Sequence, residues 1–118
     1  MWEVEFTDEF GQWWHTLAEA EQDAVAASVM VLERLGPGLP RPHADSVKGS
    51  KHSNMKELRT QCQGRPLRTF FAFDPRRTSI LLIGGDKTGD KRFYEKMIPL
   101  ADRLYDQHLQ QLADEGHM

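Results

Sequence analysis

Residues 55–85, MKELRTQCQGRPLRTFFAFDPRRTSILLIGG, decide the fold of this chain. They contain three short apolar or alternating runs, and each run ends at turn-forming residues. The runs cover residues 55–62, 67–73 and 79–83, and they end at QGRP (63–66), DP (74–75) and GG (84–85). This pattern predicts three strands, of which the last two form an antiparallel hairpin.

The residues before this stretch predict one strand and two helices. Trp2, Val4 and Phe6 alternate with glutamates, as in a short half-buried strand. Thr7 follows as a predicted N-cap. The acidic residues in the next turn support this prediction, since carboxylates near a helix N-terminus interact favourably with the helix dipole. A second helix is expected over 18–35, where GPG (36–38) ends it. A long polar loop is expected over 36–54.

After the three strands the pattern becomes helical again. Asp90 is expected to cap a short helix over 91–98, and Pro99 to begin or kink a final helix. The order β-α-α-β-β-β-α predicts an α+β fold. We expect the two N-terminal helices and the C-terminal helix to pack on one face of a small, mostly antiparallel sheet. The chain is expected to form a single domain over 1–118, with 113–118 as a frayed tail.

Composition limits the class of protein. The 118 residues are 39% hydrophobic and 28% charged, as in ordinary soluble proteins. The longest apolar run, Ile80–Ile83, is far too short to span a membrane, and Glu3 and Glu5 argue against a signal peptide. Cys62 is the single cysteine, so no internal disulfide can form. A reducing cytoplasm is the expected location, with Cys62 as a buried filler.

The net charge of −3 conceals three segments of different sign. Residues 1–40 carry −7, residues 41–96 carry +7, and residues 97–118 carry −3. A basic middle between acidic ends suggests a surface that binds a polyanion. An even spread of solvated charges is the alternative.

Alternation along the strands separates the two faces of the predicted sheet. Glu57, Arg59 and Arg68 are expected on a face that the helices leave open, with Lys87 after the last strand and Tyr94 at the start of the next helix. Arginine binds phosphate bidentately and steadies a pentacoordinate transition state, while a phenol, lysine or histidine can transfer protons. A structural ladder of ion pairs on an exposed face is the alternative reading of the same residues. The five histidines show no metal-ligand spacing, so neither a metal nor a cofactor is expected.

The chain resembles the Gp49-like branch of the RelE/HigB toxins over residues 47–109. The resemblance rests on the order and spacing of several short motifs. These are VKG (47–49), MKELR (55–59), the arginine-led aromatic strand LRTFF (67–71), GGDKTG (84–89), a helix tyrosine and IPLAD (98–102). It implies a microbial RNase fold.

The resemblance also implies an activity: ribosome-dependent cleavage of messenger RNA, in which the 2′-OH attacks the adjacent phosphate. Arg68 then matches the arginine that stabilises the transition state, Arg59 the arginine that closes the preceding strand, and Lys87 a basic residue after the last strand. Tyr94 matches a tyrosine that stacks on or orients a base. Met55 and Glu57 stand where RelE members carry lysines, so Glu57, His52 and Lys51 remain open as the general base. A general acid is not assigned.

Further residues are expected to bind RNA, and a partner is implied. The RNA-binding set is Lys48, Lys51, His52, Lys56, Arg65 and Lys91. The family implies an antitoxin, usually a helix-turn-helix DNA-binding protein, in a toxin–antitoxin hetero-oligomer. Two other functions stay open: a non-catalytic, phage-derived regulatory or protein-binding module of the same fold, and an RNA-binding domain without cleavage.

Overall fold

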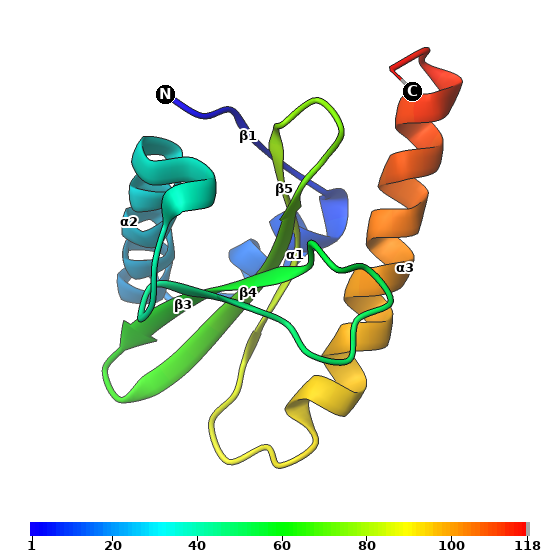
Figure 1. The fold of residues 1–118 in the computed structure, drawn as a ribbon. Helices are drawn as coiled ribbons and strands as arrows, with labels where there is room; N and C mark the ends of the chain where they lie inside the picture. The colour runs from blue at the N-terminus through cyan, green and yellow to red at the C-terminus, as the bar shows by residue number, and fades with distance from the viewer. Residues whose placement is uncertain (118) are drawn as a thin grey trace.

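The computed structural model describes residues 1–117 and shows three helices packed on a five-stranded mixed sheet (Figure 1). The α+β class predicted from the sequence is confirmed. The elements are β1 (Val4–Phe6), α1 (Asp8–His15), α2 (Glu19–Leu35), the 3₁₀ turn η1 (Gly36–Gly38), β2 (Ala44–Ser46), β3 (Lys56–Cys62), β4 (Arg65–Phe73), β5 (Ser79–Asp86) and α3 (Phe93–Asp114).

The strands lie in the order β1-β5-β4-β3-β2. The pairs β2–β3, β3–β4 and β4–β5 are antiparallel, whereas β1 pairs with β5 in parallel, with Val4 opposite Ser79. Strand β2 lies inside the segment that the sequence predicted as an uninterrupted loop. It pairs with only the first three residues of β3, which leaves the edge of β3 open beyond Leu58 apart from one bond from Arg59 N to His43 O.

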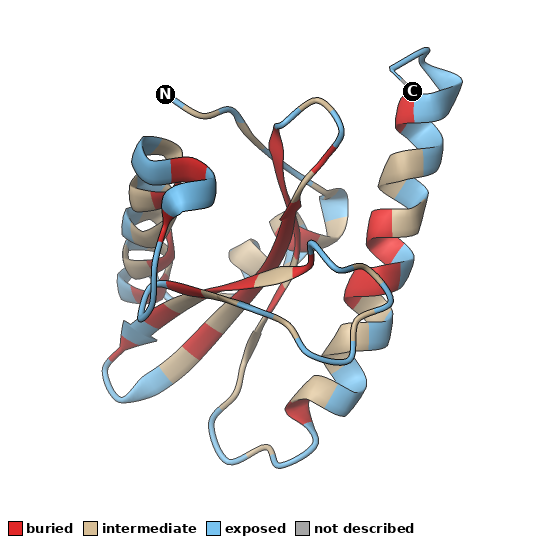
Figure 2. Ribbon diagram, viewed as in Figure 1, coloured by how far each residue is buried: buried red, intermediate tan, exposed pale blue. Residues whose placement is uncertain are grey.

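The helices cover both faces of the sheet rather than one (Figure 2). Helices α1 and α2 pack against Leu58 and Phe71, whereas α3 packs against Phe70 and Ala72. The prediction that all three helices share one face is therefore wrong. The reason lies in β4 and β5, which are buried on both sides: a sheet with two apolar faces needs a cover on each.

Two glycines permit this double cover. Strand β5 runs through Gly84 and Gly85, where the sequence predicted its end. A Cβ at Gly84 would lie 2.2 Å from the Trp13 ring, and one at Gly85 would lie 2.8 Å from the Phe93 ring. Each glycine thus lets an aromatic side chain of α1 or α3 approach the strand backbone.

Helix α3 is continuous, whereas the sequence predicted two helices divided near Pro99. Pro99 lies inside it, and its missing N–H removes one backbone hydrogen bond. Burial of Ala101, Leu104 and Tyr105 against the sheet compensates for this loss. The helix includes Ala113 and Asp114, which were expected in a frayed tail, and Met118 lies outside the described residues. Among residues 1–117, no helix has the length and apolarity needed to cross a membrane.

Candidate active site

Two arginines face each other across β3 and β4 on the side of the sheet that carries α3. Arg59 is the direct cross-strand partner of Arg68. Like charges in this register repel, so a ladder built for stability would pair each arginine with a carboxylate. Both arginines do lie beside one carboxylate, Glu57, at 3.1 Å from Arg59 and 3.8 Å from Arg68, so this register fits the ion-pair ladder that the sequence left open as well as a phosphate-binding cluster.

Glu57 supplies the nearest negative charge and is almost fully buried. Its side chain is only 5% exposed. Oε2 accepts hydrogen bonds from Arg59 Nε at 3.2 Å and Nη2 at 3.1 Å, and Oε1 accepts one from Tyr94 Oη at 2.7 Å. Strand β3 and helix α3 thus meet at one carboxylate.

Arg68 has a donor without an acceptor. Its Nε is buried, lies 3.8 Å from Glu57 Oε1 and makes no hydrogen bond within the described residues. Nη1 donates to Leu67 O at 3.1 Å. This Nε–H is therefore a donor that Arg68 can offer to an oxygen of an anionic ligand.

Tyr94 and Lys87 complete the cluster at the start of α3. Lys87 Nζ lies 5.2 Å from the centroid of the Tyr94 ring, as in a cation–π contact. Burial, and then the hydrogen bond to Glu57, raise the pKa of Tyr94 above its ordinary value. The phenol is therefore protonated at neutral pH, and it can donate a proton but cannot accept one.

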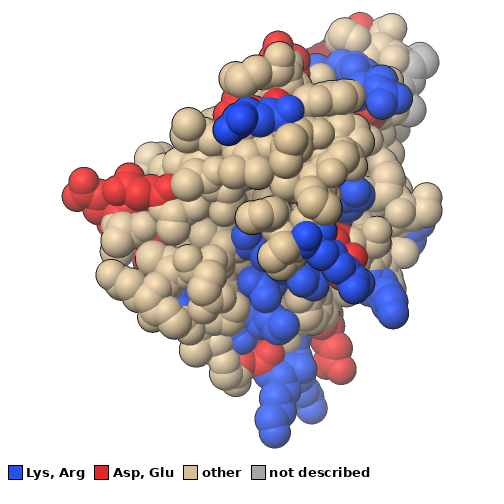
Figure 3. Space-filling model, turned by 60° about the vertical axis from the view of Figure 1, so that its left-hand side comes forward, with Lys and Arg blue, Asp and Glu red and all other residues tan. Residues whose placement is uncertain are grey.

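The structure thus brings together the five residues that the sequence selected for catalysis: Glu57, Arg59, Arg68, Lys87 and Tyr94. The three cations outnumber the single carboxylate in this cluster. Figure 3 shows lysine and arginine side chains gathered on the lower part of one face of the molecule, with few acidic ones between them. A surface of this kind attracts polyanions.

The residues expected to bind RNA are only partly available for it. Lys51 and His52 both contact Asp106, His52 at 2.8 Å, about 18 Å along α3 from Tyr94. Arg65 bonds to the carboxylates of Glu21 and Asp86. Among the described residues, the remaining three, Lys48, Lys56 and Lys91, take part in no ion pair.

A cavity of about 540 Å³ adjoins the arginines at the open edge of β3. Gln61 and His43 line it together with Arg59 and Arg68, and both are exposed. Sequence reasoning did not select these two residues. Gln61 could have been found, because alternation places it on the same face as Glu57 and Arg59, whereas His43 comes near only through the loop that carries β2.

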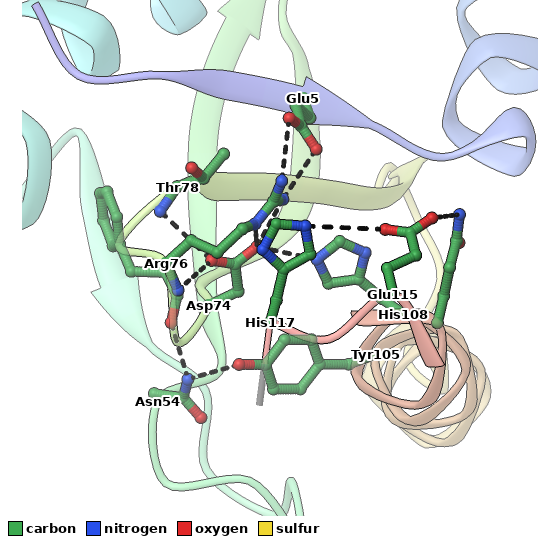
Figure 4. Close-up of polar contacts among 11 residues, drawn as sticks. Glu5, Asn54, Asp74, Arg76, Thr78, Tyr105, His108, Glu115 and His117 are labelled. Carbon is green, nitrogen blue, oxygen red and sulfur yellow. Dashed lines mark hydrogen bonds and ion pairs between the residues drawn. The ribbon is translucent and has the colours of Figure 1, made fainter. Parts of the chain in front are cut away.

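A second polar cluster lies toward the other end of α3 (Figure 4). The Asp74 side chain is fully buried and accepts hydrogen bonds from Arg76 and from the backbone of Thr78, and it lies 2.8 Å from His108 Nε2. Arg76 also pairs with Glu5 on β1. Burial alone would raise the pKa of Asp74, but the hydrogen bonds from Arg76 and His108 outweigh burial and lower it. Because its contacts join the β4–β5 turn, β1 and α3, we assign this cluster a structural role.

In the part of the chain that the structure describes, no group of three or more histidine, cysteine or acidic side chains is arranged to hold a metal ion.

Comparisons with known proteins agree with this architecture. Residues 12–106 match the family described as phage derived protein Gp49-like (DUF891). The chain is 43% identical over 104 residues to the Mycobacterium tuberculosis protein named "Putative toxin HigB2" and 45% identical over 93 residues to "Putative toxin HigB3" of the same organism. These alignments cover 86% and 78% of this chain. They span about half of the length of the first relative (52%) and 80% of the second.

A solved structure shares the fold. The crystal structure of the isolated Escherichia coli RelE toxin superposes with a TM-score of 0.59 at 8% identity, over 82% of this chain and 96% of that one. At this identity the likeness concerns the fold alone. From the family match and the two relatives, the chain belongs to the Gp49-like family and, with it, to the RelE/HigB toxin superfamily.

Proposed function

We propose that this protein is the toxin of a type II toxin–antitoxin pair and a ribosome-dependent endoribonuclease that cleaves messenger RNA. The observation that carries the proposal is the cluster around Glu57, in which Arg59, Arg68 and Tyr94 converge and Arg68 Nε has no acceptor among residues 1–117. The family supports the toxin assignment, since its relatives are named as HigB toxins. The cytoplasm, with an antitoxin as partner, is the setting that this proposal implies.

The reaction proposed is an internal transesterification. The 2′-oxygen of one nucleotide attacks the adjacent phosphorus, the bond to the 5′-oxygen breaks, and the products are a 2′,3′-cyclic phosphate and a 5′-hydroxyl. RNA supplies the nucleophile itself, so the enzyme needs only to place charge and to transfer protons.

Each residue of the cluster has a role in this reaction. Arg68 and Arg59 bind the non-bridging oxygens, and the free Nε of Arg68 donates to the charge that develops in the transition state. Glu57 takes the proton of the 2′-OH, because it is the only carboxylate in the cluster. The 5′-oxygen takes a proton from Tyr94, which is bonded to Glu57, or from Lys87, which lies over the Tyr94 ring.

The sequence left Glu57, His52 and Lys51 as candidates for the general base, and their positions in the structure favour one of them. His52 and Lys51 contact Asp106 and lie about three helical turns away from Tyr94. We therefore propose Glu57 rather than either of them.

Toeprinting of a translating messenger RNA in a reconstituted system tests the proposal. Wild type should cut inside the decoding site, and Arg68→Ala should not. Arg34→Ala is the matched control, because Arg34 is exposed within the acidic segment 1–40 and makes no ion pair among the described residues. Failure of the folded wild type to cut would favour the non-catalytic protein-binding module instead.

A further inference from the structure

An apolar groove lies between α1, α2 and β1 and shares no lining residue with the cavity beside the arginines. Its volume is about 510 Å³. We call it the α1–α2 groove, and its lining consists of Val4, Phe6, Phe10, Gly11, Trp14, His15, Ala26, Val29, Met30, Glu33 and Leu81. Phe6 is 64% exposed and Met30 is 62% exposed, although both are large apolar side chains. Exposed apolar surface gathered in one hollow is typical of a binding site.

The sequence of α2 shows why this surface remains open. Val25 and Leu32 form the stripe that α2 buries in the core. Ala26, Val29, Met30 and Glu33 lie on an adjacent stripe with spacing i, i+3, i+4 and i+7, which lines the groove. Helix α2 therefore has a second apolar side, which the fold itself only partly covers.

The charge of the segment that forms the groove selects the kind of partner: Glu33 lines the groove, and Glu19 and Asp23 continue the same stripe of α2, seven and three residues before Ala26. Residues 1–40 carry eight acidic residues and one basic residue, Arg34. Most of these acids have no ion-pair partner within residues 1–117, namely Glu3, Asp8, Glu9, Glu19, Asp23 and Glu33. Like charge repels nucleic acid from this face, and a second copy docked by the same face would oppose acid to acid.

We propose that the α1–α2 groove binds an amphipathic helix of a protein partner whose flanking residues are lysine or arginine. The apolar face of such a helix, with anchors at i, i+3, i+4 and i+7, contacts Phe6 and Met30. Its basic flanks meet the carboxylates on this side of α2, those of Glu19, Asp23 and Glu33, which speeds encounter and fixes orientation. Only the naming of this partner as the antitoxin rests on the proposed function.

Binding there leaves the cluster around Glu57 uncovered. Helices α1 and α2 pack on one face of the sheet, whereas Tyr94 belongs to the helix on the other. A partner in the groove would therefore inhibit this protein by steric hindrance, because it would prevent a large substrate from approaching. It would not fill the active site.

The probe is a synthetic peptide of about five helical turns, with leucine at the anchor positions and lysine elsewhere. A second peptide replaces every lysine by glutamate. Binding is measured by fluorescence anisotropy, and the site is mapped by amide chemical shifts in ¹⁵N-labelled protein. The lysine peptide should shift the amides of Gly11, Trp14 and Val29, and the glutamate peptide should bind at least about tenfold more weakly.

Variants locate the site and separate it from the nuclease. The double change Phe6→Glu with Met30→Glu should weaken binding of the lysine peptide by about tenfold or more. Leu35→Glu is the matched control, since Leu35 is 49% exposed and does not line the groove. Arg68→Ala should bind the peptide as wild type does, so failure of the nuclease proposal would not alter this result.

Three results would overturn the inference. Equal binding by the Phe6→Glu, Met30→Glu protein would place the peptide elsewhere. Equal binding of the lysine and glutamate peptides would remove the role of charge. Self-association of the wild type in sedimentation, abolished by the same double change, would make the groove a contact between copies.

Discussion

Tyr94 Oη donates a 2.7 Å hydrogen bond to Glu57 Oε1, although the two residues are 37 positions apart. The bond ties the first turn of α3 to β3 and fixes the carboxylate between two arginines. This hydrogen bond serves both the fold and the proposed chemistry. It holds α3 against the sheet, and it directs a phenol proton toward the carboxylate that we propose as the base.

Tyr94→Phe should reduce the loss of folding stability that the protein shows at alkaline pH. The pKa of Tyr94 is raised in the folded state, so its contribution is fully present below the ordinary value of about 10 and is lost as pH rises through the folded pKa. Urea unfolding of the wild type should show falling stability above about pH 10, and Tyr94→Phe should flatten this fall. The pKa of Tyr105 is raised as well, so Tyr105→Phe should remove its own share of the fall and leave that of Tyr94. An unchanged slope in Tyr94→Phe would show that this phenol is not buried against Glu57.

Glu57→Gln should abolish most cleavage while keeping the shape of the side chain. The amide cannot accept the 2′-OH proton, and we expect a loss of about 100-fold or more in the single-turnover rate on programmed ribosomes. Asp45→Asn is the control, because Asp45 also contacts Arg59, at 3.4 Å, but lies outside the cluster of Glu57, Arg68 and Tyr94. If Glu57→Gln and Asp45→Asn reduce the cleavage rate equally, the role of Glu57 is to neutralise the charge of Arg59 and not to accept a proton.

Arg68→Lys should be nearly as damaging as Arg68→Ala. Lysine keeps the charge but lacks the planar fork and the Nε–H that stands without an acceptor. We expect a cleavage loss of about 100-fold or more and a change in unfolding free energy of about 1 kcal/mol or less. The sequence suggested that Arg68 is exposed, but its side chain is only 13% exposed. Circular dichroism of both variants checks the fold, and full activity in Arg68→Lys would reduce its role to charge alone.

Asp74→Asn should destabilise the protein in a pH-dependent way. The pKa of Asp74 is lowered in the folded state, so its stabilisation is present above the ordinary value of about 4 and is lost as pH falls through the folded pKa. The difference in unfolding free energy between wild type and Asp74→Asn should therefore be large at pH 7 and shrink in acid. A constant difference between about pH 2 and pH 7 would contradict the assignment of the charged form.

Lys48→Ala should lower the salt dependence of RNA or ribosome binding, and Lys51→Ala should do so less. Lys48 is exposed and has no ion-pair partner among the described residues, whereas Lys51 pairs with Asp106. Loss of one phosphate contact should reduce the slope of log K against log salt by about one. Equal changes for the two lysines would show that RNA displaces Asp106 from Lys51.

The sequence contained enough to place the cluster but not its surroundings. Alternation within β3 and β4 assigns Glu57, Arg59 and Arg68 to one face, because that pattern depends only on neighbouring residues. The end of β5 was predicted too early because Gly84 and Gly85 usually mark turns. In this fold they instead admit Trp13 and Phe93, which come from distant segments.

The remaining differences also depend on contacts between distant segments. The side of the sheet that α3 covers follows from the apolar character of both faces of β4 and β5, which is ambiguous in a short strand. Pro99 suggested a break, yet the packing of Leu104 and Tyr105 on the sheet carries the helix past it. Ion pairs such as Lys51 with Asp106 join segments 55 positions apart and leave no local signal.

The parallel pairing of β1 with β5 has a consequence for synthesis of the protein. Val4 pairs with Ser79, so the first strand must wait for most of the chain before it finds its partner. Such a long-range contact is slow to form and cannot form while the C-terminal half is still inside the exit tunnel. If the protein cleaves messenger RNA on the ribosome, as proposed, the nascent chain cannot cut the message from which it is being made until β5 and α3 have emerged.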